Sequence, residues 1–231
     1  MLHELLGISL QEKRIISICG GGGKTSLMYA LARESGGTGK TAVFTTTNIF
    51  IPEEPDVHWL HPFDAETAEG IWNRRQIVSA GLPLADLNKL AAPEEEVQEW
   101  LIANSDGIYV EADGSKRLPL KYPAEWEPVP LGESTDIVVV AGLSALGKPR
   151  CEVVHRAALA EEKIGYCEDH VTESGLAKLL WAGYGQFNPV FCLNQADTEE
   201  QEQRGARVAE ELLSLGARRV VVLSLRNLVG A

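Results

Sequence analysis

The chain lacks any long, unbroken apolar run, and no stretch approaches the roughly 20 apolar residues that a membrane-spanning helix needs. Its first residues, MLHELLGISLQEKR, have too short an apolar stretch and the wrong order of charges for a secretory signal peptide. We therefore expect a cytoplasmic location and no membrane partner.

Positive charge is also scarce. The 231 residues carry 21 Lys and Arg against 33 Asp and Glu, a net charge of −12, so we expect no nucleic-acid partner. The four cysteines are Cys19, Cys151, Cys167 and Cys192, and no two of them form a Cys-x-x-Cys pair. We interpret them as reduced structural thiols rather than as metal ligands. An anionic ligand must therefore be bound by a local site.

Such a site is indicated by residues 14–32, RIISICGGGGKTSLMYALA, in which an apolar strand leads into four glycines and then a helical pattern. Backbone without Cβ atoms can curve around a phosphate with its N–H groups pointing inward, and the helix N-terminus adds partial positive charge. Lys24 would contact the terminal phosphates and Thr25 would ligate Mg²⁺. The predicted nucleotide-binding residues of this loop are Gly20, Gly21, Gly22, Gly23, Lys24, Thr25 and Ser26.

The loop departs from the pattern G-x-x-x-x-G-K-[ST] in one place, since the first glycine of that pattern would fall at Ile18. A glycine-rich linker is the alternative interpretation. Linkers, however, are not flanked by an Ile-rich strand and a helix, which is the context that a phosphate loop requires.

A second informative stretch is DGIYVEADGSKRLPL, residues 106–120. Its apolar strand ends in Glu111 and Asp113, as a Walker B strand does, so both carboxylates are candidates for binding Mg²⁺ and for catalysis. Lys116 and Arg117 follow and are candidates for gripping a substrate or partner. A solvated charged loop is the alternative for these two cations.

Four more polar residues are candidates for contacting a substrate or partner. Thr46 and Thr47 end a predicted strand over residues 40–47, although threonine is also an ordinary strand residue. His155 and Arg156 precede a predicted helix, where they would contact a phosphate or, alternatively, cap and pack the helix.

A third informative stretch follows the apolar strand 189–193 and reads Asn194-Gln195-Ala196-Asp197. In P-loop GTPases a strand in this place ends in Asn-Lys-x-Asp, whose Asp accepts hydrogen bonds from guanine. Gln195 replaces that Lys here, so Asn194 and Asp197 are candidate nucleotide ligands that leave ATP and GTP both open. Capping of the following helix is the alternative.

These elements predict an α/β protein with a mostly parallel sheet and helices on both faces, a P-loop NTPase-like three-layer sandwich. We expect one domain over residues 1–231, with an inserted segment at about 51–104. The predicted strands also include 57–60, 76–80, 135–142 and 217–224, and the helices include 64–74, 93–103, 172–182 and 198–215. Asp64 and Thr172 are predicted N-caps.

Several stretches in this order resemble the YqeC family: GGGGKTS, TTTN, VEADGSKRLPLK, GLSALGKP with VHR, and LNQAD. The family is described as selenium-dependent hydroxylase accessory proteins or selenium cofactor biosynthesis proteins. The resemblance runs from about Ile15 to Asp197. It implies a role in maturing selenium-dependent molybdenum hydroxylases, with such an enzyme or its cofactor precursor as a partner, and it brings no catalytic residues beyond the loop.

The loop also looks like that of metallochaperone and nucleotide-switch P-loop proteins, whose deviant form carries an extra Lys before the glycines. Cys19 occupies that place in this chain, so we do not expect a dimer that depends on such a Lys.

The leading hypothesis is an accessory protein that binds and hydrolyses ATP or GTP with Mg²⁺ and uses hydrolysis to drive insertion or release. A small-molecule kinase or ligase is the first alternative, because a G-G-G-K-T loop before a Thr-rich strand also appears in peptide-wall ligases. A non-catalytic nucleotide-binding docking module is the second.

Overall fold

The computed structural model describes residues 1–37, 39–85 and 87–229. The chain divides into two compact units, each assembled from separate segments. The first unit comprises Met1–Ile18, Thr25–Asp113 and Val129–Asp136, and the second comprises Cys19–Lys24, Gly114–Pro128 and Ile137–Ala231. The expectation of one domain with an insertion at about 51–104 stays a prediction.

The first unit is built on parallel strands in the order β1-β8-β2-β5-β4. The strands are β1 (Arg14–Gly20), β8 (Gly107–Glu111), β2 (Thr41–Thr45), β5 (Ile77–Ala80) and β4 (Val57–Leu60). Every neighbouring pair is parallel, and the central strands β8 and β2 are buried along their whole length. Such unbroken burial is typical of a parallel sheet that is covered on both faces.

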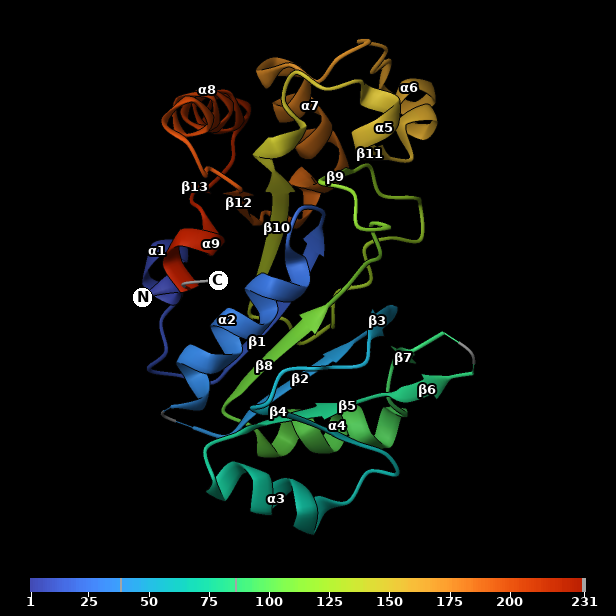
Figure 1. Ribbon diagram of the computed structural model, residues 1–231, viewed down its shortest axis with the longest axis vertical. Helices are drawn as coiled ribbons and strands as arrows, with labels where there is room; N and C mark the ends of the chain where they lie inside the picture. Colours follow the sequence, from blue (N-terminus) through green and yellow to red (C-terminus); the bar gives the residue numbers. More distant parts are fainter. Residues whose placement is uncertain (38, 86, 230–231) are drawn as a thin grey trace. The chain divides into compact units, whose positions relative to one another are not determined.

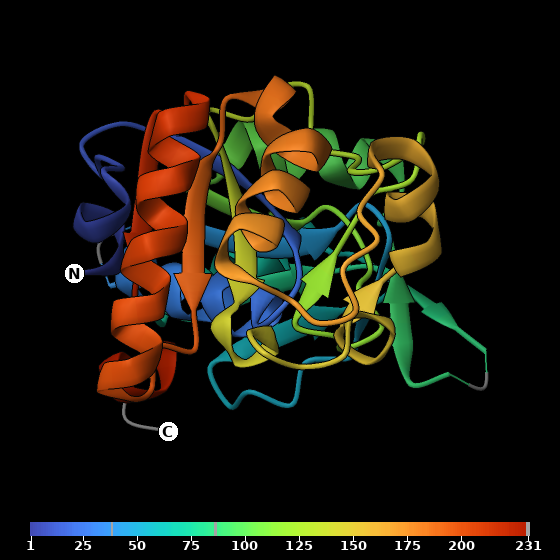
Figure 2. The same cartoon turned by 90° about the horizontal axis from the view of Figure 1, so that it is seen from above.

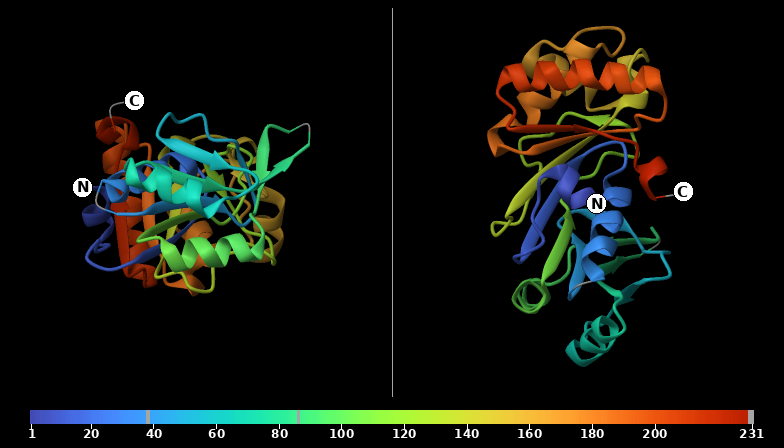
Figure 3. Two further views of the ribbon diagram at one scale, coloured as in Figure 1. Left: turned by 90° about the horizontal axis from the view of Figure 1, so that it is seen from below. Right: turned by 90° about the vertical axis from the view of Figure 1, so that its left-hand side faces the viewer.

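Helices cover both faces of this sheet. On one face lie α3 (Ala65–Asn73) and α4 (Glu95–Asn104) (Figure 3). They pack on a core that includes Phe44 and Ile108, and Trp72 of α3 stacks on Trp100 of α4. The helices α1 (Leu2–Leu6) and α2 (Lys24–Gly36) lie on the other face. Tyr109 follows Ile108 in β8 and therefore points to this other face, where its hydroxyl bonds to Nε2 of His3 in α1 at 2.7 Å. The predicted helical cover is therefore confirmed for this unit.

A small antiparallel sheet, which the sequence did not predict, completes the first unit (Figure 1). Its strands are β3 (Asn48–Phe50), β7 (Lys89–Ala91) and β6 (Leu82–Leu84), in the order β3-β7-β6. The predicted strand 40–47 is wrong at its end, since β2 stops at Thr45. The amide of Thr47 there donates to Oγ1 of Thr45 at 3.0 Å, a side-chain turn that competes with the strand ladder.

The second unit is built on three parallel strands in the order β13-β12-β10. They are β10 (Asp136–Gly142), β12 (Val190–Asn194) and β13 (Arg219–Val222). Seen from above in Figure 2, α7 (Glu173–Tyr184) and α8 (Glu199–Leu215) cover these strands. A Cβ added to Gly205 of α8 would lie 2.8 Å from Val222 of β13, so this glycine allows the helix to approach the sheet closely.

Shorter elements complete the second unit. They are β9 (Leu120–Lys121), η1 (Leu143–Ala145), α5 (Arg150–Val153), β11 (Val154–His155), α6 (Ala157–Ile164), η2 (Gly185–Phe187) and α9 (Leu225–Val229).

The predicted N-caps Asp64 and Thr172 are confirmed, since their side chains accept hydrogen bonds from the amides of Thr67 and Gly175.

The predicted class, α/β with a mostly parallel sheet, is also confirmed. Within the part of the chain that the structure describes, no helix combines the length and apolar character needed to cross a membrane.

Candidate functional site

The glycine loop is a tight turn between strand and helix. Strand β1 continues through Ile18 to Gly20, and α2 begins at Lys24. Ile18 is fully buried as a strand residue, so the chain turns later than the pattern G-x-x-x-x-G-K-[ST] would require. The turn begins at Gly20, whose φ is +95°, and Gly22 and Gly23 also have positive φ values, of +79° and +120°. Because the turn begins at Gly20, the backbone at position 18 does not need a glycine.

The surroundings of the loop exclude side chains as well. A Cβ on Gly20 would lie 2.2 Å from the carbonyl oxygen of Val140, and one on Gly22 would lie 2.4 Å from the amide nitrogen of Gly142. Both neighbours are backbone atoms of the second unit and cannot rotate away. The glycines are therefore required by their neighbours as well as by their φ angles.

The loop offers free amide donors. The N–H of Gly21 donates to the carbonyl oxygen of Val140 at 2.8 Å. Within the described part of the chain, the N–H groups of Gly22 and Gly23 donate to no protein acceptor. The first turn of α2 follows at once and adds its own amides and the positive end of its dipole. Backbone N–H groups left without an acceptor, like those of Gly22 and Gly23, are the kind of group that can bind an anion.

Lys24 folds back over the loop. Its side chain is 5% exposed, and Nζ donates to the carbonyl oxygen of Gly20 at 2.9 Å and to Oγ of Ser115 at 3.2 Å. Ser115 follows the Glu111-Ala112-Asp113-Gly114 segment in the chain. The ammonium group is thus held at the loop by acceptors that a phosphate oxygen could replace.

The first unit supplies a hydroxyl and a carboxylate in direct contact. Thr25 Oγ1 donates to Oε2 of Glu111 at 2.6 Å, and the carbonyl oxygen of Glu111 accepts from Oγ1 of Thr45 at 2.8 Å. Glu111 is 6% exposed and Asp113 is fully buried. Because Lys24 and Thr25 are consecutive, this pair is joined covalently to the glycine loop.

These oxygen donors fit Mg²⁺, which prefers hard oxygen ligands and takes few of them from the protein. Thr25, Glu111 and Asp113 are the residues that would hold it. Among the described residues no group of three or more His, Cys, Asp and Glu side chains forms a complete protein cage for a metal. The remaining ligands would accordingly come from phosphate oxygens and water.

Tyr29 was missed by the sequence analysis. It lies four residues after Thr25 on α2, and its buried hydroxyl has no hydrogen-bond partner among the described residues. Burial, and after it the negative charge of Glu111, raise the pKa of the phenol, so Tyr29 remains a neutral donor. Residues four positions apart lie on the same side of a helix, so the spacing from Thr25 was the sequence feature that could have identified Tyr29.

The Asn194–Asp197 segment connects the end of β12 to two other segments of the second unit. Nδ2 of Asn194 donates to the carbonyl oxygen of Gly22 at 2.9 Å, and its Oδ1 accepts from the amide of Leu225 at 3.0 Å. Oδ1 of the exposed Asp197 accepts from Oγ of Ser224 at 2.5 Å. Asn194 therefore supports the glycine loop, whereas Asp197 is oriented by the chain that follows β13.

Gln195 has a left-handed backbone, with φ +68°. Its side chain packs on Gly142, where an added Cβ would lie 2.3 Å from Oε1. The side chain of Gln195, at the position where P-loop GTPases carry a Lys, therefore points toward the end of β10.

The remaining predicted residues divide between the units. In the first unit, Oγ1 of Thr46 donates to the carbonyl oxygen of Val129 at 2.7 Å, and Thr47 contacts Thr45, so both serve the turn after β2. Ser26 is exposed on the first turn of α2. The other four predicted residues belong to the second unit. Three of them, Lys116, Arg117 and Arg156, have positive φ values, and the fourth is His155.

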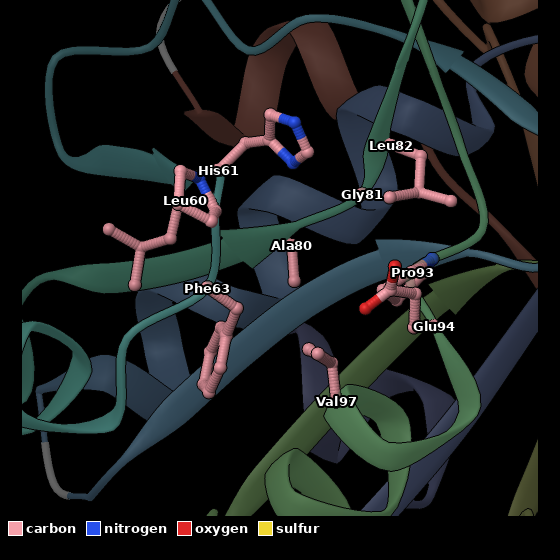
Figure 4. Close-up of a pocket in the computed structure, with 10 residues that line it drawn as sticks. Leu60, His61, Phe63, Ala80, Gly81, Leu82, Pro93, Glu94 and Val97 are labelled. Carbon is pink, nitrogen blue, oxygen red and sulfur yellow. The ribbon is translucent and has the colours of Figure 1, made fainter.

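A mostly apolar pocket in the first unit lies at the carboxyl ends of β4 and β5 and at the start of α4 (Figure 4). It is lined by Leu60, His61, Pro62, Phe63, Ala80, Gly81, Leu82, Pro93, Glu94 and Val97. None of the site residues predicted from the sequence lines this pocket, so it is distinct from the candidate nucleotide-binding residues.

The fold and these residues define an α/β protein with a glycine loop between a parallel strand and a helix, and with carboxylates after a neighbouring strand. The chain belongs to the YqeC family. The family model described as YqeC protein matches residues 16–158. The chain is also similar to a protein of Escherichia coli (strain K12) named "Uncharacterized protein YqeC", with 31% identity over 191 residues, which cover 76% of this chain and 71% of that protein.

Proposed function

We propose that this protein binds a nucleoside triphosphate with Mg²⁺ and hydrolyses it, as an accessory protein in the maturation of selenium-dependent molybdenum hydroxylases. The glycine loop is the observation that carries the nucleotide part. It combines three positive φ angles, the free amides of Gly22 and Gly23, and the ammonium group of Lys24. The maturation role is supported by the family resemblance.

The residues divide the work as follows. The loop amides bind the phosphates, and Lys24 exchanges its bonds to Gly20 and Ser115 for phosphate oxygens. Thr25 would offer an oxygen lone pair to the metal while its hydroxyl still donates its hydrogen bond to Oε2 of Glu111. Glu111 and Asp113 orient the attacking water. Bound Mg²⁺ would neutralise charge on the phosphate oxygens.

Guanine is the base that we favour. A carboxylate accepts hydrogen bonds, and guanine presents two neighbouring donors on its ring edge, whereas the corresponding ring nitrogen of adenine is an acceptor. Asp197 is exposed, and Ser224 fixes the position of one of its oxygens. Exchange of Asp197 for Asn is expected to reduce the preference for GTP over ATP in competition titrations.

Calorimetric titration tests nucleotide binding directly. Mg-GTP and Mg-ATP are titrated into the native protein, into Lys24→Ala and into Lys163→Ala. Lys163 is a suitable control because it is 41% exposed and pairs only with surface carboxylates. We expect binding to disappear in Lys24→Ala and to persist in Lys163→Ala. Equal binding by the native protein and Lys24→Ala would refute the assignment.

The alternatives predict different products. A hydrolase releases free phosphate, whereas a kinase or ligase yields a phosphorylated or adenylated acceptor that mass spectrometry detects. A docking module binds nucleotide without turnover, even when a purified molybdenum hydroxylase is present. For the accessory role, we expect nucleotide-dependent activation of such a hydroxylase by the native protein and none by Lys24→Ala.

A further inference from the structure

The second unit contains a group of positively charged side chains around the short strands β9 and β11. We call Lys116, Lys121, His155 and Arg156 the cation cluster. The strands β9 and β11 lie side by side (Figure 1), and Lys121 and His155 are direct partners in their parallel pairing. Their side chains therefore project from the same face of this ladder. Three members of this cluster were candidates from the sequence, and Lys121 was not.

One carboxylate serves two of these cations. Nζ of Lys121, which is fully buried, lies 2.7 Å from Oε2 of Glu127, and Arg156 donates to the same oxygen. Burial alone would raise the pKa of Glu127, but the hydrogen bonds from Arg156 and Lys121 outweigh it and lower the pKa to about 2. Glu127 is therefore ionised at neutral pH and is shared by two cations.

His155 lies among these cations. Burial first, and then Arg156, Lys121 and Lys116, lower the pKa of its imidazole, and the charge of Glu127 opposes them. The ring is half-buried and makes no hydrogen bond with the described residues. In a chain with a net charge of −12, three cations are thus gathered around a neutral imidazole.

An exposed tryptophan lies beside the cluster. Trp126 is 73% exposed, and the guanidinium carbon of Arg156 lies 5.8 Å from the centroid of its ring. Arg156 has a left-handed backbone, with φ +65°, as does Lys116, with φ +51°. Such conformations are unfavourable for residues other than glycine and concentrate at binding sites. A large exposed indole beside the guanidinium group of Arg156 is suited to stacking with an aromatic ring.

We propose that the cation cluster and Trp126 form a second ligand site, for a flat aromatic heterocycle that carries a phosphate group. The ring stacks on Trp126, the phosphate is bound by Arg156 and Lys116, and His155 bonds to a polar atom at the ring edge. A short segment links this site to the glycine loop, since Ser115 contacts Lys24 and Lys121 follows six residues later. The further suggestion that this ligand is the substrate of a nucleotide-dependent reaction rests on the proposed function.

Flavin mononucleotide and riboflavin are matched probes, because they share one ring system and differ in the phosphate. Stacking on tryptophan quenches flavin fluorescence, so titration of protein into each flavin reports binding. We expect flavin mononucleotide to bind roughly tenfold or more tightly than riboflavin, because one charge-assisted hydrogen bond to its phosphate contributes about that much affinity. Trp126→Leu should abolish the quenching, and Arg156→Ala and Lys116→Ala should each weaken flavin mononucleotide binding. Lys116 is exposed, so that variant serves even where Arg156→Ala fails to fold.

Two controls separate this site from nucleotide binding. Lys163→Ala removes one positive charge from the same unit and should change nothing. Lys24→Ala, and saturation with a non-hydrolysable GTP analogue, should also leave flavin mononucleotide binding intact. The proposal is overturned if the native protein does not quench flavin mononucleotide, if riboflavin binds equally well, if Trp126→Leu quenches normally, or if GTP competes. Loss of GTP binding in Lys24→Ala with unchanged flavin binding supports both sites.

Discussion

Glu111 and Glu127 are both largely buried carboxylates, with exposed fractions of 6% for the Glu111 residue and 11% for the Glu127 side chain, yet their partners differ in kind. Glu111, in the first unit, accepts a hydrogen bond from the neutral hydroxyl of Thr25. Glu127, in the second unit, accepts from Lys121 and Arg156. The hydroxyl of Thr25 brings no positive charge to Glu111, whereas Lys121 and Arg156 each bring one to Glu127. The charge of its partners determines how strongly the pKa of a carboxylate is lowered.

The largest effect expected from this comparison is on stability. Glu127→Gln leaves the fully buried Lys121 without the carboxylate beside it, and breaking a buried ion pair in this way lowers the free energy of unfolding by about 3 kcal/mol. Urea denaturation measures the change. Glu125→Gln is the matched control, since Glu125 pairs with Lys163 on the exposed surface, and it should leave the midpoint unchanged. Equal urea midpoints for Glu127→Gln and Glu125→Gln would show that the ion pairs of Glu127 contribute no more to stability than the surface pair of Glu125.

The second effect is on metal dependence. Glu111→Gln keeps the shape of the side chain and an acceptor for Thr25 but removes the charge. We expect the contribution of Mg²⁺ to nucleotide affinity to fall about 10- to 100-fold, the range seen when groups around a metal are changed. Titrations with Mg²⁺ and with EDTA measure this contribution. Glu127→Gln should retain the native metal dependence, and the same loss in both variants would contradict the comparison.

The smallest effect is a gradual response to acid. The pKa of Glu127 lies near 2 in the folded state, below its ordinary value of 4.5, so the unfolded chain takes up a proton first as the pH falls. The stability that Glu127 contributes is complete above pH 4.5 and is lost progressively between 4.5 and about 2. Urea midpoints measured from pH 5 down to about pH 2 should therefore bring the native protein closer to Glu127→Gln. A constant difference between the two proteins over this range would mean that the pKa of Glu127 is not lowered by folding.

Local sequence predicted the elements on which the candidate site is built. The Ile-rich run and the helical pattern around the four glycines correspond to β1 and α2, and the strand before Glu111 corresponds to β8. Asp64 and Thr172 were identifiable as N-caps because capping involves an amide only three residues away. Interactions of such short range leave a readable pattern in the sequence.

The rest depended on contacts between distant segments. The pairing of β9 with β11 joins two-residue strands that are too short to show any periodicity. The sequence therefore did not predict a role for Lys121, Glu127 or Trp126, although Lys121 is the last residue of the family stretch VEADGSKRLPLK. Asn194 was predicted to contact a nucleotide, and the structure shows it bonded to Gly22, 172 residues away in the chain. No local pattern carries that information.

By itself, the sequence determined a chain that alternates strands and helices, a glycine loop that carries Lys24 and Thr25, and carboxylates at a strand end. Those features follow from φ preferences, hydrophobic periodicity and residue order, which act over a few residues. The tertiary structure alone decided where the loop turns, that Thr25 contacts Glu111, and that two cations share Glu127. These outcomes depend on burial and charge pairing between segments far apart in the chain, because the energy of a charged group is set by its neighbours in space.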